Sequence, residues 1–244
     1  MSLTVGVLAL QGGFHEHLTL LHQASQHIQS TDSQAQAKQF VFSEVRTSEQ
    51  LAQCDALIIP GGESTTISLV AGQTDLLEKL REFVKVNRKP TWGTCAGLIL
   101  LSQQANATKQ GGQELIGGLS VRVHRNHFGR QIESFEADLS LPFLSSASST
   151  EDSPSPTFPG VFIRAPVVEE VLATDDVQVL AKLPGRVDRM KPGVSQASIM
   201  DDSGDIIAVR QGNVFGTSFH PELTSDARIH AWWLREILRS KGQA

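Results

Sequence analysis

Short apolar runs alternate with stretches of helical periodicity through the first hundred residues of this chain. The run LTVGVLAL, 3–10, ends at a glutamine and two glycines, which is typical of a buried strand. After this run, apolar residues recur at helical spacing, namely Phe14, Leu18, Leu21 and Ala24, which predicts a helix. The segment that follows, 26–40, is mostly polar, and we expect it to be a surface excursion.

Three further apolar runs predict strands, and two more segments have the spacing of helices. The expected strands cover 40–45, 55–59 and 89–94, and the expected helices cover 76–86 and 96–104. Strands that alternate with helices favour an α/β fold, in which a mainly parallel sheet is covered by helices on both faces. The pattern therefore predicts a three-layer architecture.

The C-terminal half has several apolar runs close together, which predict some antiparallel strands. They cover 160–166, 177–183 and 205–219, and the glycine within 211–213 predicts a hairpin turn. We expect a last helix, capped by Ser225, whose apolar face consists of Ile229, Trp232, Trp233, Leu234 and Ile237.

Two segments of this half resemble surface insertions. Residues 145–159 are rich in serine and proline, which is typical of a loop, and 184–205 is long for a connection between strands. We expect one domain, 1–244, that carries these two insertions.

The composition narrows the class of protein. A net charge of −5 without a block of lysine or arginine argues against a nucleic-acid partner. No apolar run approaches the ~20 residues that a membrane-spanning helix needs, and the N-terminus lacks a basic leader. Two cysteines in 244 residues do not make a disulfide framework, so we expect a cytoplasmic location.

One of these cysteines, Cys95, lies between two glycines where an expected strand meets an expected helix. Small residues permit a strained turn of this kind, which lifts the side chain above the sheet as in a nucleophile elbow. The helix N-terminus then favours the thiolate, and the backbone N–H of Ala96 could donate to an oxyanion. The alternative for Cys95 alone is a buried, inert thiol.

A second pattern, His220-Pro221-Glu222 at the end of an expected strand, decides between these interpretations. Residues two apart on a strand project to the same face, so Glu222 could orient the imidazole of His220. The imidazole could then take the proton from sulfur and return it to a leaving group. Ligands bind at the carboxyl edge of strands in open α/β sheets. We therefore predict a Cys95–His220–Glu222 triad there.

G-x-C-x-G with a distant H-P-E resembles the class I (triad) glutamine amidotransferases, whose fold is flavodoxin-like. More narrowly, the sequence resembles the glutaminase subunit of pyridoxal 5′-phosphate synthase. That likeness runs from residue 5 to residue 224, through VGVLALQG, LIIPGGESTT, GTCAGLILL, RNHFGRQIESFEADL, VFIRAP and GTSFHPELT. The motifs G-x-C-x-G and H-P-E are shared by several amidotransferases, whereas R-N-x-F-G-R-Q and F-I-R-A-P are far more specific to this subfamily.

The resemblance implies roles for further residues. The amide of Gly62 would be the second oxyanion donor beside that of Ala96, and Gln11 would lie at the mouth of the site near the partner interface. The glutamine substrate would be held by Gly61, Gly62, Glu63, Ser64, Arg125, Ile163 and Arg164. An arginine can bind the α-carboxylate in a bidentate manner, and the sequence leaves open which of the two does so.

The resemblance also implies an activity and a partner. The chain would hydrolyse L-glutamine through a γ-glutamyl thioester, without cofactor or metal, and pass ammonia to a (β/α)₈-barrel synthase subunit in a large hetero-oligomer. Alternatives are a glutaminase of another enzyme such as imidazole glycerol phosphate synthase, a γ-glutamyl peptidase, and a non-catalytic regulatory subunit. Four histidines near the N-terminus lack the spacing of a helical zinc site, and we expect them to be solvated: His15, His17, His22 and His27.

Overall fold

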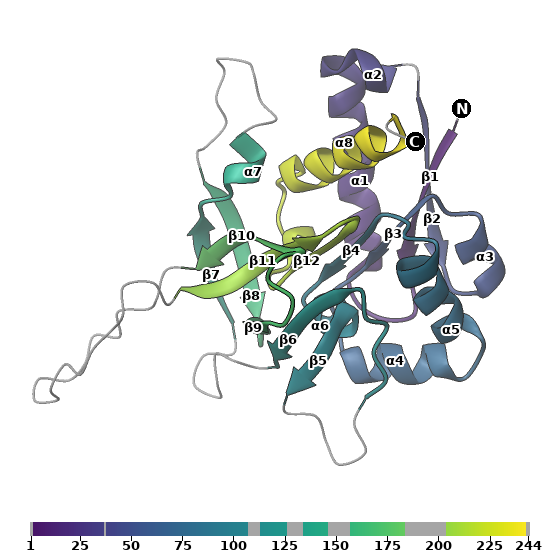
Figure 1. Ribbon diagram of the computed structural model, residues 1–244. Coiled ribbons are helices and arrows are strands. Elements are labelled where there is room, and N and C mark those ends of the chain that lie inside the picture. The colour runs from purple at the N-terminus through teal and green to yellow at the C-terminus, as the bar shows by residue number, and fades with distance from the viewer. Residues whose placement is uncertain are drawn as a thin grey trace, which may run out of the picture.

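The computed structural model describes residues 2–36, 38–106, 113–125, 134–145, 157–183 and 204–242. A large mixed sheet runs through the molecule, with helices on both of its faces (Figure 1). The strands are β1 (Ser2–Leu8), β2 (Gln39–Val45), β3 (Ala56–Ile59), β4 (Thr91–Thr94), β5 (Ser102–Asn106), β6 (Leu119–His124), β7 (Ser134–Leu139), β8 (Phe158–Ile163), β9 (Val167–Val171), β10 (Val177–Leu183), β11 (Asp205–Gln211) and β12 (Val214–Thr217).

The strand order of the large sheet is β2-β1-β3-β4-β12-β11-β9-β6-β5, and β10 pairs with β11. Strands β2, β1, β3, β4 and β12 pair in parallel, whereas β12, β11, β9 and β6 pair in antiparallel fashion. Strands β7 and β8 form a separate antiparallel pair. The predicted class, a mainly parallel sheet between helices with antiparallel strands in the C-terminal half, is therefore confirmed.

Helices cover the parallel strands on both faces. The helices are α1 (Phe14–Thr31), α2 (Ser33–Gln36), α3 (Ser48–Ala52), α4 (Ser64–Gly72), α5 (Leu76–Arg81), a π-helical turn η1 (Glu82–Val86), α6 (Ala96–Leu101), α7 (Pro142–Ser145), a 3₁₀ turn η2 (Pro221–Leu223) and α8 (Arg228–Gly242). Neighbouring residues of β3 alternate between two cores, because side chains of a strand point to opposite faces. Ile58 packs with α1 and α8, whereas Leu57 and Ile59 pack with α4, α5 and α6.

The last helix has the apolar face that its spacing predicts. Its five expected apolar residues are all buried, and α8 lies beside α1, as the yellow and purple helices of Figure 1 show. The helix begins at Arg228, whose backbone N–H donates to Asp226 Oδ1 at 3.0 Å. The expectation that Ser225 caps the helix is therefore wrong, because Asp226 is the residue that accepts from its first turn.

Two other expectations from the polarity pattern are also wrong. The polar segment 26–40 is not an excursion throughout, since α1 continues to Thr31 and buries Ile28. The helix expected over 96–104 ends at Leu101, and Ser102 begins β5. Polar side chains that face solvent fit an exposed helix face and an exposed strand equally well, so polarity alone does not distinguish them.

The hairpin between β11 and β12 is confirmed. Gly212 has a φ of +56°, a conformation that glycine adopts without a steric penalty. The expected insertions at 145–159 and 184–205 lie largely outside the described residues. Their boundaries, and the assignment of 1–244 to one domain, stay predictions.

Candidate active site

Cys95 occupies a strained turn between β4 and α6. Its φ is +45° and its ψ is −98°, a conformation that few residues other than glycine adopt. Its N–H donates to the carbonyl of Thr217 on β12 at 2.8 Å, and its carbonyl accepts from the N–H of Ile99 at 3.2 Å. Hydrogen bonds from the neighbouring strand and the helix thus hold the backbone in this conformation.

The glycines that flank this turn are required by close packing. A Cβ atom on Gly97 would lie 2.0 Å from the carbonyl oxygen of Ile59 on β3. A Cβ atom on Gly93 would lie 2.5 Å from the backbone carbon of Gly97. Helix α6 can therefore begin this close to the sheet only with glycine at both positions, which is the physical reason for the G-x-C-x-G spacing.

His220 and Glu222 follow β12 and form a buried pair. Nδ1 of His220 lies 2.8 Å from Oε1 of Glu222. The two residues do not stand on one strand, as the sequence suggested, because β12 ends at Thr217 and Glu222 lies in the 3₁₀ turn η2. The pairing is as expected, but the tight turn after Pro221 brings the two side chains together.

The environment of His220 favours its charged form. Burial disfavours the imidazolium, but hydrogen bonds to Cys95 and Glu222, and the charges of both groups, outweigh it and raise the pKa of His220 to about 10. The side chains are mostly shielded from water, since Cys95, His220 and Glu222 are 6%, 8% and 4% exposed. This arrangement favours an imidazolium beside the sulfur of Cys95.

The loop between β3 and α4 packs against this group of residues. The N–H of Gly61 donates to the hydroxyl of Thr94 at 2.8 Å, and its carbonyl accepts from the N–H of Gly13 at 3.0 Å. A Cβ atom on Gly61 would lie 2.3 Å from Cε1 of His220. The loop thus lies so close to the imidazole that a side chain at position 61 would clash with the ring.

Gln11 is bound to the next residues of the same loop. Its Oε1 accepts a hydrogen bond from the N–H of Glu63 at 2.7 Å, and a Cβ atom on Gly62 would lie 2.4 Å from that oxygen. Gln11 therefore lies beside the loop that would supply the oxyanion donor, and its place at a partner interface stays a prediction.

Glu63 caps helix α4. Its carboxylate accepts hydrogen bonds from the N–H groups of Thr65 at 3.1 Å and Thr66 at 2.6 Å. Burial favours the neutral acid, but the hydrogen bonds from Thr66 and Thr65 prevail and lower the pKa of Glu63. A negative charge is thus kept at the N-terminus of α4.

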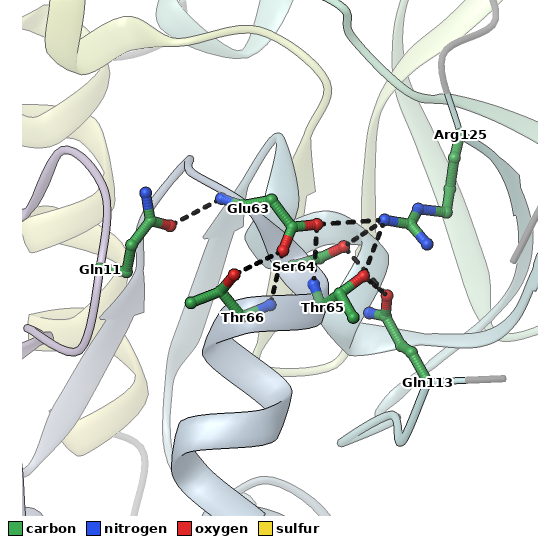
Figure 2. A network of polar contacts seen from close by, with 7 residues as sticks. All are labelled: Gln11, Glu63, Ser64, Thr65, Thr66, Gln113 and Arg125. Carbon is green, nitrogen blue, oxygen red and sulfur yellow. Dashed lines mark hydrogen bonds and ion pairs between the residues drawn. The ribbon is translucent and has the colours of Figure 1, made fainter. Parts of the chain in front are cut away.

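The guanidinium of Arg125, which follows β6, reaches the same cap (Figure 2). One of its nitrogens, Nη2, lies 3.1 Å from the hydroxyl of Ser64, 3.3 Å from that of Thr65 and 3.5 Å from Oε1 of Glu63. The hydroxyl of Ser64 also donates to Oε1 of Gln113 at 3.1 Å. Arg125, Glu63 and Ser64 are therefore brought together as predicted, and Gln113 joins them unpredicted.

Ile163 and Arg164 lie at the end of β8. Ile163 is 38% exposed, and Arg164 has a φ of +43°, which is uncommon for a residue other than glycine. The same strand is joined to the candidate triad, because the N–H of His220 donates to the carbonyl of Val161 at 2.8 Å. Strand β8 thus passes beside His220, and the contact of Ile163 and Arg164 with glutamine stays a prediction.

Sequence reasoning misplaced one residue and missed two. His17 is fully buried on α1 rather than solvated, and it contacts Thr94 and His230. A signal existed, because residues 17, 21, 24 and 28 have the spacing of one helix face, on which Leu21, Ala24 and Ile28 are buried. Nothing in the spacing of His230 or Thr94 indicates that they meet His17.

Two features are absent from the described residues. No group of three or more histidine, cysteine, aspartate or glutamate side chains in this part of the chain could hold a metal ion. Within the same residues, no helix has the length and hydropathy to cross a bilayer.

Comparisons with known proteins identify the family to which this sequence is similar. A sequence model described as the SNO glutamine amidotransferase family matches residues 7–239. The chain is 46% identical, over 96% of its length and 85% of the relative, to an Arabidopsis thaliana protein named probable pyridoxal 5′-phosphate synthase subunit PDX2. It is 40% identical to pyridoxal 5′-phosphate synthase subunit PdxT of Herpetosiphon aurantiacus, over 95% of this chain and 99% of that one.

A solved structure shares the fold. The crystal structure of a protein described as a glutamine amidotransferase matches 96% of this chain and 98% of its own, with a TM-score of 0.71 and 37% identity. The sequence and the fold therefore indicate the same group of proteins.

Proposed function

Because this chain belongs to the SNO glutamine amidotransferase family, we propose that it is the glutaminase subunit of a pyridoxal 5′-phosphate synthase. In this role it hydrolyses L-glutamine to L-glutamate and ammonia. The observation that carries the proposal is the strained Cys95 beside the buried His220–Glu222 pair, at the carboxyl ends of the parallel strands β4 and β12. The names of the relatives support the choice of synthase.

The reaction begins with the thiolate of Cys95. Sulfur attacks the side-chain carbonyl carbon of glutamine, and the electron pair of the C=O bond moves to oxygen. The N–H groups of Ala96 and Gly62 bind this oxyanion, and each such donor contributes about 2.7–4 kcal/mol in comparable enzymes. The oxyanion then collapses to a thioester, and the C–N bond breaks as the imidazolium of His220 donates its proton to the amide nitrogen, which leaves as ammonia.

Hydrolysis of the thioester uses the same groups. Neutral His220 takes a proton from water while the oxygen attacks the thioester carbon. The second tetrahedral intermediate releases the thiolate of Cys95 and leaves the γ-carboxylic acid, which gives its proton to ammonia or water to become glutamate, and His220 is again an imidazolium. Glu222 keeps Nδ1 of the ring oriented, so that Nε2 faces the reacting atoms throughout.

The α-ammonium and α-carboxylate of glutamine need an anion and a cation close together. Glu63 supplies the anion, and Arg125 and Arg164 supply cations, with Gly61, Gly62, Ser64 and Ile163 as neighbours. The contact between Arg125 and Glu63 at 3.5 Å supports this assignment. The substrate can exchange this long contact for shorter, bidentate hydrogen bonds to its own carboxylate.

Ammonia that escapes to water is wasted, so its release is best coupled to an acceptor. The proposed partner is a (β/α)₈-barrel synthase subunit in a large hetero-oligomer, and Gln11 lies at the mouth that would face it. A small displacement of the loop held by Gln11 would move the amide of Gly62. Docking of the partner can therefore switch the oxyanion donor on. A cytoplasmic location also stays a prediction.

The test is a glutaminase assay of the wild type and of Cys95→Ser, each with and without the cognate synthase subunit. We expect slow turnover by the wild type alone, faster turnover with the synthase and none by the variant. An unrelated barrel acceptor, imidazole glycerol phosphate synthase, serves as the control and should not accelerate the reaction. Glutamate release by Cys95→Ser at the wild-type rate would refute the proposal.

A further inference from the structure

A pair of buried histidines lies directly behind the candidate triad. His17 on α1 and His230 on α8 are both 0% exposed, and Nδ1 of His17 lies 2.9 Å from Nε2 of His230. The other ring nitrogen of His17, Nε2, lies 3.2 Å from the hydroxyl of Thr94 and 3.4 Å from Oε2 of Glu222. One imidazole thus contacts both the residue before Cys95 and the carboxylate behind His220.

The surroundings determine where the protons of these rings lie. Nδ1 of His230 has no hydrogen-bond partner among the described residues, and a buried nitrogen without a partner is less costly as an acceptor than as a donor. His230 therefore carries its proton on Nε2 and donates to Nδ1 of His17. The proton of His17 is then on Nε2, where it points toward Thr94 and Glu222.

Both rings stay neutral in this environment. Burial, together with the charges of His230 and His220, lowers the pKa of His17 well below its ordinary value. Burial also lowers the pKa of His230 to about 3. A neutral donor can orient the carboxylate of Glu222 without forming a competing ion pair with it, so the negative charge remains available to His220.

We propose that His17 is a positioning residue whose Nε2–H holds the Glu222 carboxylate and the Thr94 hydroxyl at once. Oε2 of Glu222 has no hydrogen bond to any described residue, and Nε2 of His17 lies 3.4 Å from it, within reach of a small adjustment of either side chain. The hydroxyl of Thr94 accepts from the N–H of Gly61 at 2.8 Å. His17 thereby fixes the orientation of the triad carboxylate relative to the loop that would bind the oxyanion.

A purely structural role is the competing explanation. His17 and His230 pack against the buried indole of Trp92, with ring centroids 5.6 Å and 4.9 Å from it, so both could serve as core residues only. A core role predicts that substitution lowers stability in proportion to lost packing. A positioning role predicts in addition that the folded protein loses kcat, and that restoring an N–H toward Glu222 restores it.

The inference rests on the proposed function, so the assay uses the chain together with its synthase subunit and glutamine. His17→Asn places its amide near the former Nδ1 and cannot reach Glu222, whereas the longer His17→Gln places an N–H near the former Nε2. His15→Asn is the matched control, because His15 is an exposed histidine of the same helix. Circular dichroism melts give the folded fraction, and kcat and KM are expressed per folded molecule.

We expect His17→Asn to lower kcat at least about tenfold with the KM for glutamine within about twofold, because the change acts on the reacting groups. His17→Gln should recover most of the loss, and His15→Asn should match the wild type. Equal kcat values for His17→Asn and His15→Asn would overturn the inference, and so would equal losses in the Asn and Gln variants.

Thr94→Val tests the same arrangement without altering the histidines. Valine replaces the hydroxyl with a methyl group of similar size, so the N–H of Gly61 loses its acceptor while the shape of the side chain changes little. We expect a loss of kcat comparable to that of His17→Asn. A kcat equal to that of the wild type would overturn the proposed role of the Thr94 hydroxyl in positioning the triad. Failure of the wild type itself to hydrolyse glutamine with its synthase would instead refute the proposed function.

Discussion

The two sides of the candidate site differ in how they are held. On the reaction side, Cys95, His220 and Glu222 are each less than a tenth exposed, and glycine contacts and the buried His17 surround them. On the recognition side, the carboxylate of Glu63 is about half exposed, at 51%, and its contact with Arg125 is a long 3.5 Å. One side is fixed by packing, and the other by polar contacts near solvent.

This difference indicates which step each side serves. Atoms that exchange protons and form bonds must be positioned within fractions of an ångström, which buried, close-packed contacts provide. Groups that bind a zwitterion must exchange their own partners for those of the ligand, which weak exposed pairs permit at low cost. Substitutions on the reaction side should therefore change kcat, and those on the recognition side should change KM.

The largest effect is expected at the nucleophile. Cys95→Ser should lower kcat by at least about a thousandfold, because an alcohol in this position is not ionised and the loss of one member disables the whole triad. Initial rates of ammonia release in the synthase complex measure this. Pull-down of the variant with the synthase subunit is the control, since the complex should still form. A variant that retains a tenth of the activity would contradict the account.

Glu222→Gln should have the next largest effect, about a hundredfold on kcat, since the amide cannot stabilise the imidazolium. It should also move the alkaline limb of the pH profile of kcat/KM to lower pH. The pKa of His220 is raised to about 10, in part by Glu222, and the imidazolium would lose its proton earlier without that carboxylate.

The free energy of unfolding should also depend on the protonation of His220 and should fall as the pH rises. Because the folded protein holds the proton of His220 more tightly than the unfolded chain, this contribution to the free energy of unfolding is complete below pH 6.5 and disappears as the pH rises through about 10. Urea unfolding across this range should show a smaller decline for Glu222→Gln than for the wild type. Identical declines would show that Glu222 does not control His220.

A smaller change on the reaction side tests the close packing itself. The Cβ atom of Gly61→Ala would lie 2.3 Å from Cε1 of His220, so the ring must shift, and we expect kcat to fall about tenfold to a hundredfold. Gly72→Ala is the control, because its Cβ atom would come no closer than 3.8 Å to Leu77. A kcat equal to that of the wild type for Gly61→Ala would show that the loop between β3 and α4 moves aside easily. That result would contradict the view that packing fixes the reaction side.

The smallest effect is expected on the recognition side. Arg125→Lys should raise the KM for glutamine about tenfold and leave kcat within about threefold, since lysine cannot bind a carboxylate in a bidentate manner. Arg122→Lys, on the strand β6 that precedes Arg125 but paired with Glu170, should change neither constant. A fall in kcat at constant KM for Arg125→Lys would show that Arg125 acts on the reaction and not on recognition of glutamine, which would contradict the comparison.

The sequence predicts the residues of the reaction side well where they lie close together along the chain. The G-x-C-x-G motif spans only five residues and His220 and Glu222 are two residues apart, although the contact that requires Gly97 is with Ile59 on β3. The reason for the second pairing was only partly right, because a 3₁₀ turn, rather than strand alternation, brings the two side chains together.

Long-range contacts explain what the sequence does not predict. His17 meets Thr94 and His230 across 77 and 213 residues, and a histidine on a polar helix gives no indication of distant partners. The early end of α6 is a local failure of another kind. The exposed glutamines after Ser102 suit a helix and a strand alike, and pairing with β6 decides for the strand.

The most direct test of the central claim is covalent trapping of the nucleophile. A glutamine-analogue electrophile is incubated with the synthase complex, and peptide mass spectrometry locates the adduct. The chain offers an internal control, because Cys54 is a second buried cysteine, and burial raises the pKa of its thiol. We predict one adduct, on Cys95, that glutamine suppresses and Cys95→Ser abolishes. Labelling of Cys54 alone, or no labelling at either cysteine, would contradict the account.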